Sequence, residues 1–278
     1  MSSLPRTCIF CGGLPLSKEH IFPRWMHQYI PLTKQGHHSL FENIRVAGTQ
    51  VRTRKHPGDP KSKTIGCVCR PCNNGWMSEI QNKTKPILSR LIQGESISLD
   101  KKSQQLLATW LTMATMVSEQ FNFVEPMIAI PRSQVAAFRE SQRPPKGWKI
   151  WVAPYAGEHE NGSWARSTVP VVGPTKAPER NADGRDLPNT QTTTIIVGKF
   201  FAHLFSSVHA QVVRKKVPPA PGLIQLWPIV SSPLLWSTSR SLSDEAADAV
   251  AEWLPVKGRQ KAAALLVHRP RLLGTNTS

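Results

Sequence analysis

The feature that most constrains this chain is a pair of C-x2-C motifs, Cys8/Cys11 and Cys69/Cys72, in a sequence with five cysteines. The two-residue spacing suits a tight turn that aims both sulfur atoms at one ion, and four thiolates complete a tetrahedral zinc site. We therefore expect a structural Zn2+ that ties together two segments far apart in the sequence. Cys67 forms a competing C-x-C pair with Cys69, and we interpret it as a small buried residue.

Charge and hydropathy narrow the class of protein. The 278 residues carry 35 Lys and Arg against 18 Asp and Glu, which gives a formal net charge of +17. The excess is spread along the chain and favours a phosphate polyanion, such as nucleic acid, as partner. The N-terminus lacks the apolar core of a signal peptide, and no apolar run approaches the roughly 18 residues of a membrane span. We expect an intracellular, cytoplasmic protein that does not enter the membrane. In this reducing compartment, thiols bind metals more readily than they form disulfides.

Hydrophobic periodicity predicts an α+β chain with three parts. Residues 1–95 form a loop-rich module that holds all five cysteines, 96–254 form a larger α+β accessory domain, and 255–278 form a basic tail. Helical spacing predicts helices at 73–94, 101–121, 133–141 and 244–254. The apolar stripe of the helix at 101–121 should open a second core. Runs of β-branched and aromatic residues predict strands at 149–155, 163–172, 192–205 and 223–230. In the tail, AAALLVH is expected to pack as a short helix.

Further motif pieces accompany the cysteines in the first module. Glu19-His20-Ile21, with Pro23 two positions later, follows the first C-x2-C pair, and Asn73 follows the last cysteine directly, ahead of Trp76. In this order the pieces resemble the HNH endonuclease family, in the zinc-stapled branch with C-x2-C, E-H-I-x-P and C-x2-C-N. The resemblance covers the cysteine-containing module and leaves the rest of the chain outside it.

The resemblance implies an antiparallel hairpin packed on one helix, the ββα-metal module of HNH enzymes. In it His20 takes the proton from water, while Glu19 and Asn73 supply oxygen ligands to a catalytic Mg2+ or Mn2+. Such a site hydrolyses phosphodiester bonds. We therefore expect a metal-dependent endonuclease that acts on double-stranded DNA, with the flanking cations as phosphate contacts: Lys18, Arg24, Lys63 and Arg70.

One position departs from the family pattern. The position that the family fills with an Asn, which orients the catalytic His, is Thr64 in this sequence. A threonine hydroxyl can bond an imidazole, although with a shorter reach. Asn43 is the rival for this role if the hairpin contains a long insertion, which the wide separation of His20 and Asn73 favours. Both assignments stay open from the sequence.

Other functions also stay open. Without the middle Asn, the chain is consistent with a catalytically inactive, zinc-stapled nucleic-acid-binding protein, and its charge is consistent with a basic RNA-associated protein. Asn73 is also a favoured residue for capping a helix. Beyond residue 95 we find no phosphate-binding glycine loop, HExxH motif or nucleophile elbow. We expect that part to position substrate or to mediate self-association as a homodimer. Small HNH enzymes occur in phages and mobile elements, and the sequence does not identify the setting.

Overall fold

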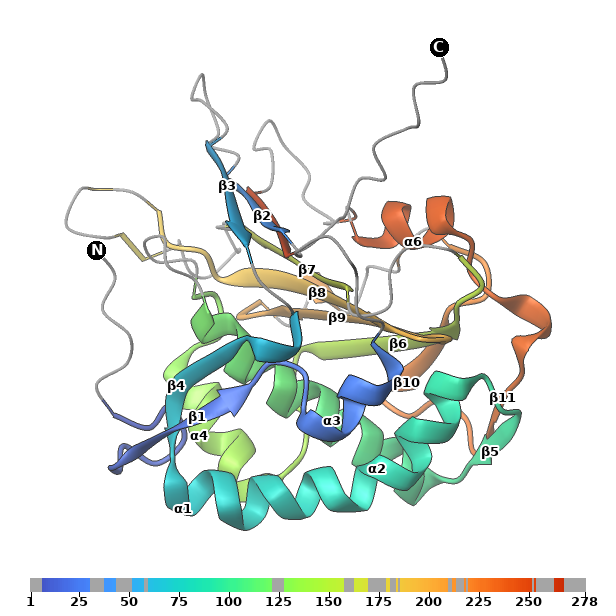
Figure 1. Cartoon of the computed structure of the whole chain (residues 1–278), viewed down its shortest axis with the longest axis horizontal. Helices are drawn as coiled ribbons and strands as arrows, with labels where there is room; N and C mark the ends of the chain where they lie inside the picture. Colours follow the sequence, from blue (N-terminus) through green and yellow to red (C-terminus); the bar gives the residue numbers. More distant parts are fainter. Residues whose placement is uncertain are drawn as a thin grey trace.

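The computed structural model describes residues 7–30, 38–43, 52–57, 60–121, 128–157, 163–169, 179–180, 184, 186–209, 212–213, 218, 220–251, 253 and 263–267. In these residues the chain is a mixed α+β structure, as expected (Figure 1). A central sheet has α2, α3 and α4 on one side, and α6 with the β2–β3 hairpin on the other. No helix of the described residues is both long and apolar enough to cross a bilayer.

The N-terminal part begins with β1 (Leu16–His20) and ends with a long helix. Between them lie η1 (Arg24–Tyr29), β2 (His38–Asn43), β3 (Arg52–Pro57), η2 (Pro60–Ser62), β4 (Thr64–Cys69), α1 (Arg70–Cys72), the π-helical turn η3 (Asn73–Met77) and α2 (Ser78–Gln93). β1 pairs antiparallel with β4, and β2 pairs antiparallel with β3. The β2–β3 hairpin is therefore an insertion between the two strands that carry the motif residues.

The β1–β4 ladder contains a bulge. Ser17 pairs with Val68 and Glu19 pairs with Ile65, so β4 advances by one more residue than β1 between these two pairs. An extra residue in one strand bends it and increases the local twist, and bulges of this kind commonly lie beside functional sites. Here the bulge comes immediately before the Glu19-His20 end of β1.

The C-terminal part supplies the central sheet. Its elements are β5 (Ile97–Leu99), α3 (Lys101–Ser118), η4 (Glu119–Phe121), α4 (Arg132–Ser141), β6 (Trp148–Pro154), β7 (Ser163–Val169), β8 (Thr190–Val197), β9 (Phe200–Ser207), β10 (Ile224–Trp227), β11 (Leu234–Trp236), η5 (Thr238–Arg240), α6 (Asp244–Ala251) and β12 (Ala263–Val267). Within the described part of the chain, the sheet has six strands in the order β10-β6-β9-β8-β7-β12, all antiparallel. β11 pairs with β5 away from this sheet.

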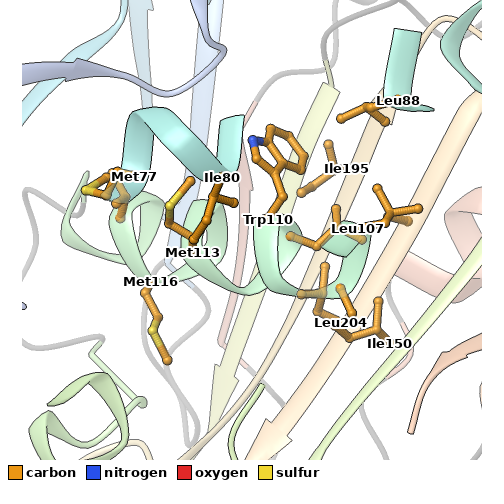
Figure 2. Packing of buried hydrophobic residues seen from close by; sticks show 14 of the residues in the cluster. Met77, Ile80, Leu88, Leu107, Trp110, Met113, Met116, Ile150, Ile195 and Leu204 are labelled. Atoms are coloured by element: carbon orange, nitrogen blue, oxygen red, sulfur yellow. The ribbon is translucent and has the colours of Figure 1, made fainter. Parts of the chain in front are cut away.

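A continuous buried cluster joins the cysteine-containing part to this sheet. Figure 2 shows α3 between α2 and the sheet, with these side chains meeting across the three layers: Met77, Ile80, Leu88, Leu107, Trp110, Met113, Met116, Ile150, Ile195 and Leu204. Cys8, Phe10 and Cys72 belong to the same cluster. The apolar stripe of α3 therefore does not open a separate second core, because it is covered from both sides. The division of the chain at residue 95 stays a prediction.

Helix α2 follows the sequence pattern closely. It ends at Gln93, and Gly94 caps it in the left-handed conformation with φ of 80°, which glycine adopts without a Cβ clash. Pro86 lies inside the helix on its exposed side. The helix at 101–121 is also confirmed, with its last turn in the 3-10 conformation.

Two sequence predictions were wrong. The single strand expected at 192–205 is two strands, β8 and β9, joined at Gly198-Lys199. Gly198 has φ of 55°, and a Cβ there would lie 2.5 Å from the carbonyl oxygen of Ile92, so the tight turn requires glycine. The short helix expected in the tail is instead strand β12, which pairs with the edge strand β7. A run of Leu and Val suits a half-buried strand as well as a helix, and pairing with β7 decides between them.

Candidate active site

The two C-x2-C motifs meet as the sequence predicts. Cys8 and Cys11 precede β1, Cys69 ends β4 and Cys72 ends α1, and their ligand atoms all lie within 4.8 Å of one another. The Sγ atom of Cys11 is 3.4 Å from that of Cys69 and 3.5 Å from that of Cys72. Four sulfur atoms bound to one Zn2+ would be roughly 3.8 Å apart, given a Zn–S bond of about 2.3 Å. The cluster therefore has the ligands and the size of a structural zinc site.

The first cysteine pair sits in a turn built from its own backbone. The N–H of Gly12 donates to the carbonyl of Cys8, and the N–H of Gly13 donates to the Cys11 sulfur. Burial opposes ionisation of Cys11, but the bond from Gly13 and the neighbouring thiols lower its pKa to about 7. Burial raises the pKa of Cys69 to about 12. A bound cation would stabilise the thiolate form of these cysteines.

The fifth cysteine lies outside the cluster. Cys67 is completely buried, and this burial raises the pKa of its thiol well above its usual range. The interpretation of Cys67 as a small buried residue is therefore confirmed. Its backbone carbonyl accepts a hydrogen bond from the N–H of Ile9, which ties the cysteine turn to β4.

The four-cysteine cluster lies next to a polar group formed by β1 and the helix that follows Cys72. Gln81 Nε2 donates to Glu19 Oε1 over 3.1 Å, and Asn73 Nδ2 donates to Ser17 Oγ over 3.1 Å. Burial raises the pKa of Glu19, while hydrogen bonds from Gln81 and Asn73 act in the opposite direction. The two hydrogen bonds join β1 to the helical segment after Cys72 and bring Glu19 and Asn73, which are far apart in the sequence, into one region of the fold.

His20 ends β1 beside a second histidine. The His20 and His27 rings are 5.6 Å apart between centroids, in an edge-to-face arrangement. His27 Nε2 lies 3.0 Å from the carbonyl oxygen of Phe22, and since that oxygen can only accept, Nε2 carries the proton. Burial, and then the charges of Arg24 and His27, lower the pKa of His20. Its imidazole is therefore predominantly neutral at pH 7.

A small pocket opens onto Glu19 and His20. Its volume is about 20 Å³, which is enough for one water molecule or one ion. The other side of the pocket is mostly apolar and comes from η3, α2 and α3: Met77, Gln81, Trp110, Met113, Ala114 and Val117. Glu19 and His20 thus both line one small space next to apolar side chains of the helices.

The two candidates for orienting His20 are in different places. Thr64 is the direct cross-strand partner of His20 in the β1–β4 ladder. Asn43 ends β2 opposite Arg52, and its side chain lies outside the described part of the structure. Among the four cations expected to contact phosphate, Lys18, Arg24 and Arg70 are exposed and Lys63 is half-buried. All four lie on the β1–β4 hairpin or directly beside it.

Sequence reasoning missed Ser17, Gln81 and His27. The alternation of a strand places Ser17 on the same side of β1 as Glu19, and this signal was present in the sequence. Gln81 lies beyond the π-helical turn and its kink at Gly75, so no helical spacing relates it to Asn73 in the sequence. His27 lies close to His20 only because the chain folds back through η1, which no local pattern indicates.

Comparisons with known proteins returned no relative. No family model matches this chain, and neither a curated protein nor a solved structure is similar to it. The functional argument therefore depends on the geometry of the chain's own residues.

Proposed function

We propose that this chain is a metal-dependent endonuclease of the HNH type that hydrolyses phosphodiester bonds in DNA. The observation that carries the proposal is that the hydrogen bonds Asn73–Ser17 and Gln81–Glu19 hold Asn73 and Glu19 near one another and near His20, where four clustered cysteines bring β1 and the helix together. A carboxylate, an amide oxygen and a neutral imidazole are the groups that metal-assisted hydrolysis of a phosphodiester needs.

The oxygen donors suit a hard divalent cation. Glu19 offers a carboxylate and Asn73 an amide oxygen, and Mg2+ or Mn2+ prefers such ligands while keeping positions for water and phosphate. Burial of the Glu19 carboxylate raises its pKa, and a bound cation would offset that cost. When bound, the ion would act as a Lewis acid toward the phosphate and the leaving oxygen.

His20 is the proposed general base. Because its pKa is lowered, the ring is neutral at pH 7 and can accept a proton from a water molecule in the pocket. Thr64, across the ladder, is the proposed residue that orients the imidazole.

The charge of the chain supports nucleic acid as the substrate. The formal net charge is +17, and exposed Lys18, Arg24 and Arg70 surround the pocket-bearing hairpin. Contacts of this kind bind the phosphate backbone without reading sequence, and their strength falls as salt rises. The structural Zn2+ would take no part in the chemistry and would only fix the hairpin against the helix.

The proposal is tested with supercoiled plasmid DNA and with structured RNA of equal nucleotide concentration. We expect zinc-loaded protein to nick the plasmid when Mg2+ or Mn2+ is added and to leave RNA largely intact. EDTA should abolish the nicking. Binding of either nucleic acid without cleavage under any metal would instead favour a nucleic-acid-binding protein without turnover. Preferential cleavage of RNA would reassign the substrate.

A further inference from the structure

The Ser17 hydroxyl determines which way the amide of Asn73 faces. Ser17 Oγ donates its single proton to the carbonyl oxygen of Val68 over 3.2 Å. Its oxygen can then only accept, so the Asn73 atom that lies 3.1 Å away must be the NH2 nitrogen. The amide oxygen of Asn73 is therefore turned away from Ser17.

Gln81 engages one oxygen of the Glu19 carboxylate. Gln81 Nε2 donates to Glu19 Oε1, and both side chains are half-buried. A hydrogen bond to the ionised form favours the carboxylate over the neutral acid. The bond also leaves the second oxygen, Oε2, without a contact to Gln81.

The two bonds come from matching positions. Ser17 and Glu19 are alternate residues on one side of β1, and Asn73 and Gln81 both belong to the helical segment that follows Cys72. Asn73 is bonded to Ser17 and Glu19 is bonded to Gln81, so each proposed ligand has a neutral partner on the opposite element.

We propose that Ser17 and Gln81 are positioning residues of the divalent-metal site, with Ser17 orienting the amide of Asn73 and Gln81 orienting the carboxylate of Glu19. This inference rests on the proposed function, because it assigns partners to the ligands of that same site. Partners of metal ligands typically affect metal affinity by roughly 10–100-fold. In this proposal each residue acts through the ligand to which it is bonded.

The test measures Mn2+ binding to the full-length, zinc-loaded protein without nucleic acid, from the electron paramagnetic resonance signal of free Mn2+. The variants are Ser17→Ala and Gln81→Met, which remove the hydrogen-bonding atoms at little change in volume. Ser17→Thr restores the hydroxyl. Gln93→Met on the same helix and Ser98→Ala on an exposed strand position are matched controls, and Glu19→Gln identifies the site.

We expect Ser17→Ala and Gln81→Met to raise the Mn2+ dissociation constant about tenfold or more. Ser17→Thr and both controls should bind Mn2+ as wild type does, and zinc content and melting temperature should stay within the range of the controls. In plasmid nicking, the Mn2+ concentration at half-maximal rate should rise by the same factor, and the rate at saturating Mn2+ should recover.

Unchanged Mn2+ affinity in both variants would overturn the inference, and so would weak binding that comes with loss of zinc or of the fold. The inference would also be overturned if the wild type bound no Mn2+, or if Glu19→Gln bound Mn2+ as tightly as the wild type does. Failure of the proposed function is distinguishable, because a wild type that binds Mn2+ through Glu19 but cleaves no nucleic acid refutes the nuclease while leaving the positioning result intact.

Discussion

His20 and Thr64 are direct cross-strand partners at the end of the β1–β4 ladder. Side chains of such a pair stand on the same side of the sheet, with Cβ atoms roughly 4.5–5.5 Å apart. Asn43 belongs to the inserted β2–β3 hairpin, where it pairs with Arg52. The strand register therefore favours Thr64 over Asn43 as the neighbour of His20. The orienting role itself stays a prediction.

Replacing Thr64 by Val should slow DNA nicking by about fivefold. Val keeps the size and the strand preference of Thr but removes the hydroxyl, and a single hydrogen bond is worth about 1 kcal/mol. Thr64→Ser keeps a hydroxyl and should retain most of the rate. The measurement is the single-turnover nicking rate at saturating Mg2+. Equal rates for Thr64→Val and wild type would exclude Thr64 from this role.

Replacing Cys11 by Ser should release zinc and destabilise the hairpin, because Cys11 contributes one of the four clustered sulfur atoms. Cys67→Ala is the matched control, since Cys67 is buried but lies outside the cluster. We expect one zinc per chain in wild type and in Cys67→Ala, and much less in Cys11→Ser, by elemental analysis of purified protein. Chelator should lower the melting temperature of wild type. If Cys67→Ala also lost its zinc, the assignment of ligands would be wrong.

Replacing Asn73 by Ala should reduce nicking by about 100-fold or more, on the scale found when one charge-stabilising group is removed from an active site. Asn74→Ala is the control, because Asn74 is the exposed next residue of the same helical turn. Both variants should keep their zinc and their melting temperature. An equal effect of the two substitutions would indicate that Asn73 acts only in the local helix structure.

His203 gives the protein a specific dependence of stability on pH. It is completely buried and contacts the rings of Trp151 and Trp253, its Nδ1 atom bonds the Thr194 hydroxyl, and burial lowers its pKa to about 3. Between that value and the ordinary value near 6.5, the unfolded chain binds a proton that the folded chain does not. Stability should therefore fall as pH falls below about 6.5, by about 1.4 kcal/mol per pH unit from this group.

The check is urea unfolding at pH 7.5 and pH 5.5, followed by tryptophan fluorescence. His203→Gln removes the titrating group. The free energy of unfolding should therefore fall less between pH 7.5 and pH 5.5 in this variant than in wild type, by about 1 kcal/mol. Other titrating groups contribute equally to both proteins and cancel. Identical pH dependence of the two proteins would contradict the assignment.

The parts that the sequence predicts well are those with a local signature. The spacing of the cysteines predicts the four-sulfur cluster, and the periodicity of α2 and α3, with Gly94 as a stop, predicts both helices. The strands at the centre of the sheet are long runs of β-branched and aromatic residues, and these are recognisable without any tertiary information.

The parts that it does not predict depend on contacts between distant segments. The turn at Gly198 lies within an unbroken strand-like run, and only the close approach of Ile92 shows why glycine stands there. The single buried cluster around α3 follows from packing on both of its faces, which periodicity alone does not specify. Likewise Gln81 becomes part of the site only because α2 packs beside β1.

The most direct test of the central claim compares wild type, His20→Ala and His27→Ala on supercoiled plasmid, with Mg2+ and with EDTA. His27→Ala is the matched control, since it removes the neighbouring ring and leaves the proposed base. We predict Mg2+-dependent nicking by wild type, a loss of roughly 100-fold or more in His20→Ala, and a much smaller effect in His27→Ala, with zinc content and DNA binding retained in all three. Nicking by His20→Ala at the wild-type rate, or none by folded, zinc-loaded wild type, would contradict the account.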